Sequence, residues 1–246
     1  MKIEILSLVI LVVFATASCH DTKEEYETDE QHMQTQKTQE IYSLSDSAGV
    51  WHNQFMDVCM SDVIVTDTLI ANDIREERIN DLAVIFFSLK FELSHHEIKQ
   101  IVNDFLGHKN SQSDLLASTD LNRARIFGVI LDSYSTLPDA QAILSVFDSL
   151  KTSEKEFIRN NPDVNAVLNL AEASVYYWTE SSREIGLSKR DPLTARQRQI
   201  LNADGDAAID GAIGGFILGC FNPFAAVSGC IVGGSIGSIR KAIELN

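Results

Sequence analysis

Glycine is concentrated at the carboxyl end of this chain. Nine of the thirteen glycines fall in the last forty-two residues. Six of them form two runs at four-residue spacing: Gly211, Gly215 and Gly219, then Gly229, Gly233 and Gly237. Residues four apart lie on one stripe of a helix, and glycine lets another backbone approach that stripe closely. Because a glycine inside a helix costs about 1 kcal/mol relative to alanine, the pattern predicts a glycine zipper whose tight packing offsets this cost.

The glycine-rich segment is too long for one straight membrane span. No residue between 211 and 239 is charged. A single helix of that length would measure about 43 Å, against about 30 Å for the hydrocarbon core of a bilayer. Asn222-Pro223 interrupts it, because proline cannot donate to the helix ladder and disfavours helical geometry in the residue before it. We therefore predict a helical hairpin with its two glycine stripes face to face. Its helices would cover residues 211–221 and 224–239, with the turn near 222–227.

Residues 191–246 thus form a predicted membrane-associated tail that inserts into lipid or packs against it. Four basic residues would lie at the same headgroup surface: Arg196, Arg198, Arg240 and Lys241. The hairpin would also bring Cys220 towards Cys230 and associate with further copies of the chain. Small residues also permit tight packing in soluble proteins, so burial of the hairpin in the chain's own core is the alternative.

The amino terminus predicts export. Lys2 is followed by the apolar run ILSLVILVVFATA and then Ser18 and Cys19, which is typical of a signal peptide over residues 1–18. Ala17-Ser18-Cys19 resembles the lipobox of bacterial lipoproteins, with Thr16 where leucine is usual. The resemblance implies that Cys19 is the lipid attachment site in the cell envelope, on the outer membrane. The alternative is ordinary cleavage nearby, with Cys19 a plain thiol.

An acidic, largely polar segment follows. Residues 19–45 are almost free of apolar side chains before Ile41, so we expect a flexible tether. Lys23-Glu24-Glu25 resembles the acidic signal of surface-exposed lipoproteins in some Gram-negative bacteria, which implies surface display. A charged linker that only keeps the domain off the membrane fits equally well.

Residues 46–190 read as a small all-helical bundle. The segment has only two prolines and no sustained apolar–polar alternation. Ser94 and Glu97 form a capping box before an apolar helical face that ends at Gly107. Pro138-Asp139 and Pro162-Asp163 favour helix starts. The predicted fold class is therefore all-α, a helical bundle followed by a glycine-zipper hairpin.

The sequence offers little that points to catalysis. His95-His96-Glu97 invites a metal interpretation, but the capping box explains Glu97 and no second ligand pair follows. Asp204-Gly205-Asp206 matches only part of a calcium loop. The formal net charge of −15 argues against nucleic acid as a partner. We predict no enzyme, no catalytic residue, no metal site and no cofactor.

Three short motifs carry a family resemblance. They are GVWHN at residues 49–53, AEAS leading into VYYW at 171–178, and RQILNAD at 198–204. Together with the glycine runs they are similar to a family of uncharacterised bacterial lipoprotein-like proteins that combine a helical domain with a glycine-zipper tail. Within the first motif, His52 and Asn53 form either a ligand-binding pair or a polar pair that satisfies backbone groups in the core; we favour the core.

Three functions are compatible with these features. The first is an envelope lipoprotein whose tail inserts in or packs on a membrane and self-associates, in a structural or sensing role. The second is a membrane-perturbing protein, since the glycine runs also resemble the pore-forming segments of small bacteriocins. The third is a soluble helical binding module that buries the zipper in its core.

Overall fold

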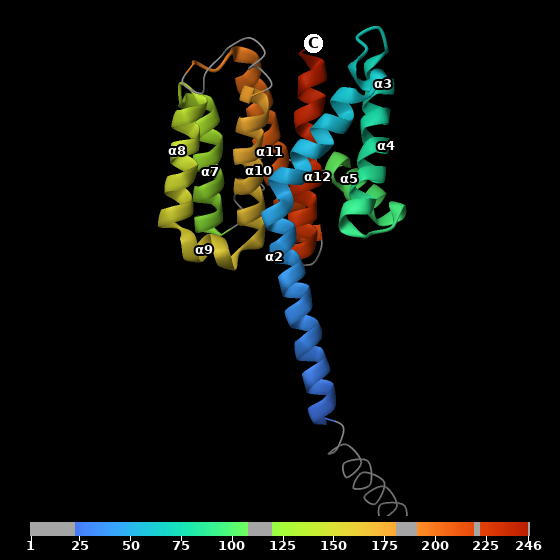
Figure 1. Cartoon of the computed structure of the whole chain (residues 1–246), viewed down its shortest axis with the longest axis vertical. Coiled ribbons are helices and arrows are strands. Elements are labelled where there is room, and N and C mark those ends of the chain that lie inside the picture. Colours follow the sequence, from blue (N-terminus) through green and yellow to red (C-terminus); the bar gives the residue numbers. More distant parts are fainter. Residues whose placement is uncertain (1–22, 108–119, 181–190, 219–221, 246) are drawn as a thin grey trace, which may run out of the picture. The chain divides into compact units, whose positions relative to one another are not determined.

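The computed structural model describes residues 23–107, 120–180, 191–218 and 222–245. Over these residues the chain forms ten helices and no strand, which confirms the predicted all-α class (Figure 1). The helices are α2 (Lys23–Ser61), α3 (Val63–Thr66), α4 (Asn72–Phe91), α5 (His95–Gly107), α7 (Leu121–Thr136), α8 (Ala140–Ser153), α9 (Lys155–Asn160), α10 (Pro162–Glu180), α11 (Ala195–Leu218) and α12 (Pro223–Glu244). The predicted signal peptide and Cys19 lie outside the described residues.

The compact unit of the chain begins earlier than we expected. It covers Ile41–Asn246, and residues before it form a separate unit. Leu44 and Ser45 are buried and helix α2 starts at Lys23, so the segment from Lys23 onward is helical where we expected a flexible tether over residues 19–45. The physical reason is the spacing of Ile41, Leu44 and Ala48, which places three apolar side chains on one face of a helix.

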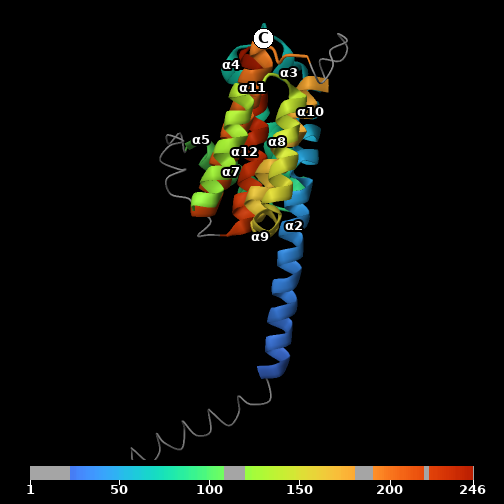
Figure 2. The same ribbon diagram turned by 90° about the vertical axis from the view of Figure 1, so that its left-hand side faces the viewer.

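The tail is part of this same unit and not a separate domain. Helix α12 contacts α4, α5, α10 and α11, and the figures show it inside the bundle beside α11 (Figures 1 and 2). Buried residues occur on every side of α12 between Ala226 and Ile243. A helix that is apolar all round is stable in water only when other elements cover it. The boundary predicted at residue 191 therefore has no counterpart in the structure.

The two tail helices meet at their glycines. A Cβ atom at Gly211 would lie closer than 3.0 Å to the carbonyl oxygen of Gly229, and the reverse is also true. A Cβ atom at Gly215 would likewise lie closer than 3.0 Å to the carbonyl oxygen of Ala225. Gly237 packs instead on Ala207 and Ala203, which lie one and two turns before Gly211 respectively. The small-residue stripe of α11 thus begins before the glycine run, which the sequence interpretation missed.

The ends of the hairpin differ from the prediction. Helix α11 starts at Ala195 and helix α12 ends at Glu244, so both are longer than expected. Asn222 caps α12 by accepting a hydrogen bond from the Phe224 amide at 3.0 Å, and Pro223 occupies the first turn. Residues 223–227 are therefore helical and do not form the turn that we expected there. Gly219 and Cys220 lie outside the described residues, while Gly233 is buried.

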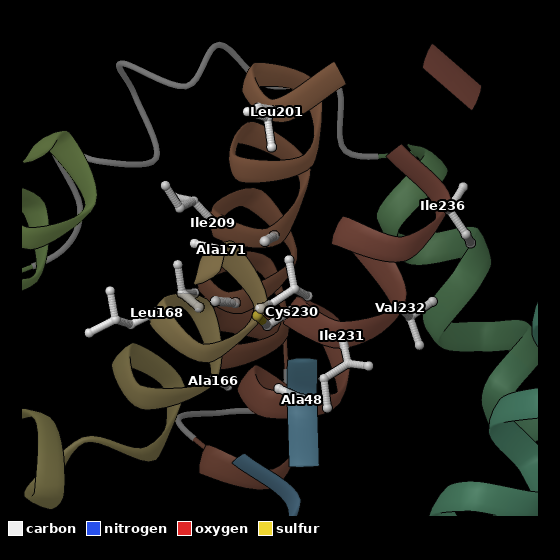
Figure 3. Close-up of a cluster of buried hydrophobic side chains, with 14 of the residues drawn as sticks. Ala48, Ala166, Leu168, Ala171, Leu201, Ile209, Cys230, Ile231, Val232 and Ile236 are labelled. Atoms are coloured by element: carbon white, nitrogen blue, oxygen red, sulfur yellow. The ribbon is translucent and has the colours of Figure 1, made fainter. Parts of the chain in front are cut away.

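Apolar side chains from three other helices surround the middle of α12. Figure 3 shows Cys230 and Ile231 with Ala48 of α2, Leu168 of α10 and Ile209 of α11. All these side chains are buried. Among the described residues, no helix has the length and apolar character needed to cross a membrane.

The basic residues beside the hairpin bind protein groups. Arg198 donates to the carbonyl oxygens of Tyr134 and Pro138, at 3.0 and 3.1 Å. Arg240 donates to Asn80 Oδ1 at 3.2 Å. Arg196 donates to Ala242 O at 3.4 Å, which joins the start of α11 to the end of α12. These contacts differ from the headgroup-facing arrangement that we expected.

Candidate functional site

His52 lies in the core, with no exposed surface. Its Nδ1 is 2.8 Å from Asn53 Oδ1, and its Nε2 is 3.1 Å from Asp204 Oδ2 on α11. Asn53 Nδ2 donates to the carbonyl oxygen of Ala173 on α10 at 3.4 Å. The pair predicted at residues 52 and 53 is thus a core polar pair in this structure, and it joins α2 to α10 and α11.

Asp204 is the partner of His52, and the sequence interpretation missed this contact. In the sequence, Asp204-Gly205-Asp206 matches only part of a calcium loop, and in the structure these residues lie inside α11. Asp204 is fully buried, and apart from the His52 contact neither carboxylate oxygen has a hydrogen-bond partner within the described part of the chain. The sequence did contain a signal for this contact. Asp204 has apolar residues one turn before and after it in a helical segment, and a buried acid requires a counter-charge nearby.

The electrostatics favour an ion pair. Burial opposes protonation of His52, but the charge of Asp204 and the hydrogen bonds that His52 donates to Asp204 and Asn53 outweigh it and raise the pKa of the imidazole. Burial, followed by the same carboxylate charge, raises the pKa of Tyr134 and of Cys230. Tyr134 donates its hydroxyl to Ala171 O at 3.0 Å. The arrangement therefore favours the protonated imidazole of His52 beside Asp204 and the protonated thiol of Cys230.

This cluster is suited to structure more than to catalysis. The side chains of His52, Tyr134, Asp204 and Cys230 have no solvent-accessible surface, so a substrate has no path to them in this conformation. A nucleophilic cysteine requires a lowered pKa, and that of Cys230 is raised. The ion pair does have a clear physical effect: it ties the amino-terminal helix of the bundle to the glycine-rich hairpin.

A cleft of about 590 Å³ lies between α4 and α5. Glu77, Asp81 and Ile85 line it from α4, and His95, His96 and Lys99 line it from α5. The lining mixes acidic, basic and apolar side chains. Such a cleft can bind a polar ligand or a peptide side chain. Because its lining carries both acidic and basic side chains, it favours neither an anionic nor a cationic ligand.

Glu97, next to the histidines of this cleft, belongs to a capping box. Glu97 accepts hydrogen bonds from the Ser94 amide at 2.8 Å and the Ser94 hydroxyl at 2.7 Å, and the Glu97 amide donates to Ser94 Oγ at 3.3 Å. These bonds confirm the predicted capping box, and they lower the pKa of Glu97. Within the described ranges, no group of three or more histidine, cysteine or acidic side chains could hold a metal ion.

Comparison with known proteins adds no relative. No protein family, curated protein or solved structure matches the chain. Function must therefore be argued from the geometry of this molecule alone.

Asp210 gives a testable pH dependence. Burial and then the charge of Asp206 raise the pKa of Asp210 from 3.8 to about 6. The folded state therefore binds a proton more tightly than the unfolded state, so this group lowers the free energy of unfolding as the pH rises from about 4 to about 6. We expect Asp210→Asn to be more stable than the wild type at pH 7.5, with the difference shrinking towards pH 4. Urea unfolding of both proteins at the two pH values measures this, and a difference independent of pH would contradict it.

Proposed function

We propose that the protein is an exported, lipid-tethered helical binding module whose glycine-rich hairpin is its own core. The observation that supports this is the burial of α12. Gly229, Cys230 and Gly233 are buried at its centre, and four other helices pack around it. The apolar surface that would otherwise favour lipid is already covered by the protein, which removes the main driving force for insertion.

In this proposal the membrane contact is made by Cys19 and not by the tail. Acylation at that residue would anchor the chain, and the compact unit from Ile41 onward would carry the binding surfaces. The buried His52–Asp204 pair supports a non-enzymatic role, because both side chains are fully buried and present no surface to a substrate.

A second candidate function is membrane insertion by the hairpin. One observation favours it: α11 and α12 contact each other through bare backbone at Gly211 and Gly229, so the hairpin can keep its own packing if it leaves the bundle. Self-association of the tail in lipid, in a structural, sensing or membrane-perturbing role, belongs to this candidate.

Membrane fractionation of a Cys19→Ala variant separates the two. The binding-module proposal predicts that the wild type sediments with membranes and that Cys19→Ala, with the complete tail, moves to the soluble fraction. Burial of α12 covers the apolar surface of the tail that could otherwise hold the variant on lipid. Dye-loaded liposomes mixed with the soluble variant should stay intact. Retention of the variant on membranes, or release of the dye, would contradict the proposal and favour hairpin insertion.

A further inference from the structure

Exposed apolar side chains concentrate around α3. Within the described part of the chain, nine large hydrophobic residues are exposed, and five of them lie between residues 60 and 74. The five are Met60, Val63, Ile64, Leu69 and Ile74, with exposed fractions from 38% to 93%. We call residues 60–74 the apolar loop; Figure 1 shows this segment at the start of α4. Single exposed apolar residues are ordinary, but such a concentration marks an interaction surface.

The first half of the apolar loop is held in place by Asp62. Its Oδ1 accepts from the amides of Ile64 and Val65, at 2.9 and 3.2 Å, and so caps α3. Its Oδ2 accepts from Nε and Nη2 of Arg78 on α4, at 3.0 and 2.9 Å. Val65 is fully buried on the inner side of α3. Val63 and Ile64 are therefore fixed in orientations that face solvent.

The second half is a hydrogen-bonded turn. Asp67 Oδ1 accepts from the Leu69 amide at 2.8 Å, and Asp67 O accepts from the Ile70 amide at 3.2 Å. This geometry is an Asx turn, and it presents Leu69 at its tip with 93% of the side chain exposed. A surface that is already ordered loses little conformational entropy on binding, which favours affinity.

Acidic side chains predominate around the apolar loop, although Arg78 pairs with Asp62 and Arg240 lies 3.7 Å from Glu76. Residues 57–77 contain six acids: Asp57, Asp62, Asp67, Asp73, Glu76 and Glu77. The one base in this range, Arg75, is only 5% exposed, and Arg78 next to it pairs with Asp62. An acidic rim repels anionic lipid and a second copy of the same surface, and it attracts a basic partner.

We propose that the apolar loop docks a basic amphipathic segment of another protein, one that presents aliphatic side chains flanked by lysine or arginine. The proposal rests on the proposed binding function and names its partner class. The aliphatic side chains of the partner would cover Val63, Ile64 and Leu69, and its cations would face Asp67 and Asp73. A central apolar contact with a charged rim is the usual distribution in such interfaces.

Fluorescence anisotropy of the full-length protein with labelled peptides tests this. The probe is a helical peptide of leucine and lysine in amphipathic order, and its counterpart has glutamate in place of lysine. The lysine peptide should bind, and the glutamate peptide should not. The double variant Val63→Ser and Leu69→Ser should weaken binding at least about tenfold, because the apolar centre is lost. Added salt should also weaken binding by the wild type.

Leu121→Ser is the matched control, since Leu121 is 89% exposed but belongs to α7. It should leave the affinity unchanged. Equal affinities for the wild type and the double variant, or binding of both peptides alike, would overturn the proposal. Loop-dependent binding to vesicles of anionic lipid, without peptide binding, would assign the surface to a membrane instead. If the lysine peptide does not bind but Cys19→Ala remains soluble, the docking proposal is wrong and the proposed function stands. If Cys19→Ala stays on membranes, the proposed function is wrong, whatever the result with the peptides.

Discussion

Gly211→Ala is expected to lower the free energy of unfolding by about 3 kcal/mol. Alanine by itself favours a helix by about 1 kcal/mol over glycine, so the substitution opposes a local gain. The loss comes from the added methyl group, which would lie closer than 3.0 Å to the carbonyl oxygen of Gly229. Backbone cannot move aside as a flexible side chain can, so α11 and α12 must separate and lose contacts along their length. Urea unfolding followed by circular dichroism measures the change.

Gly214→Ala is the control on the same helix. A Cβ atom at Gly214 would meet no atom within 4 Å, so only the helix preference changes. This variant should be more stable than the wild type by up to about 1 kcal/mol. If alanine at positions 211 and 214 has the same effect, the two backbones are not in contact, and both the fold of the hairpin and its proposed role as the core are wrong.

His52→Leu is expected to destabilise the protein by about 3–5 kcal/mol, because it leaves the buried carboxylate of Asp204 without its counter-charge. The two side chains are both fully buried and lie 3.1 Å apart. The double variant His52→Leu and Asp204→Leu should lose much less than the sum of the two single changes, since replacing a buried ion pair with apolar residues is often close to neutral. Urea unfolding of the four proteins gives the coupling energy. Additive losses would contradict a direct pair.

The same pair sets a second pH dependence. The pKa of His52 is raised above 6.5 in the folded state, so its stabilising contribution is fully present below pH 6.5 and is lost as the pH rises through the raised value. The stability difference between wild type and His52→Leu should therefore shrink at alkaline pH. A difference that grows with pH would show that the imidazole is neutral in the fold.

Local features were the most predictable part of this fold. The capping box at Ser94 and Glu97 and the interruption of the glycine-rich segment at Asn222-Pro223 depend on neighbouring residues only, and the structure contains both. The same chemistry at Thr194 and Gln197, which exchange hydrogen bonds at the start of α11, was present in the sequence and was missed. That omission made the predicted hairpin too short. The single turn α3 was also missed, although its N-cap Asp62 accepts from the amides of Ile64 and Val65 and is a local signal.

The candidate site was only half predictable. His52 and Asn53 were recognised as a core polar pair, but their counterpart on α11 was not, because a contact between distant segments leaves no periodic pattern. Asp204 can be buried because the imidazole of His52 lies 3.1 Å from its carboxylate, and only the fold brings the two together. Likewise, Leu69 is exposed although it is apolar, because the Asx turn formed by Asp67 places it at the surface.

The sequence by itself determined that the chain is helical and that glycines at four-residue spacing would allow two helix backbones to touch. Both properties follow from short-range backbone geometry, in which each residue acts on neighbours one turn away. Only the tertiary structure decided what the bare stripes touch and what covers the outer faces of the hairpin. A glycine stripe has no side chain with which to select lipid, another chain or its own partner helix, so the choice depends on the surrounding helices, and here α4, α5 and α10 complete the cover around α12.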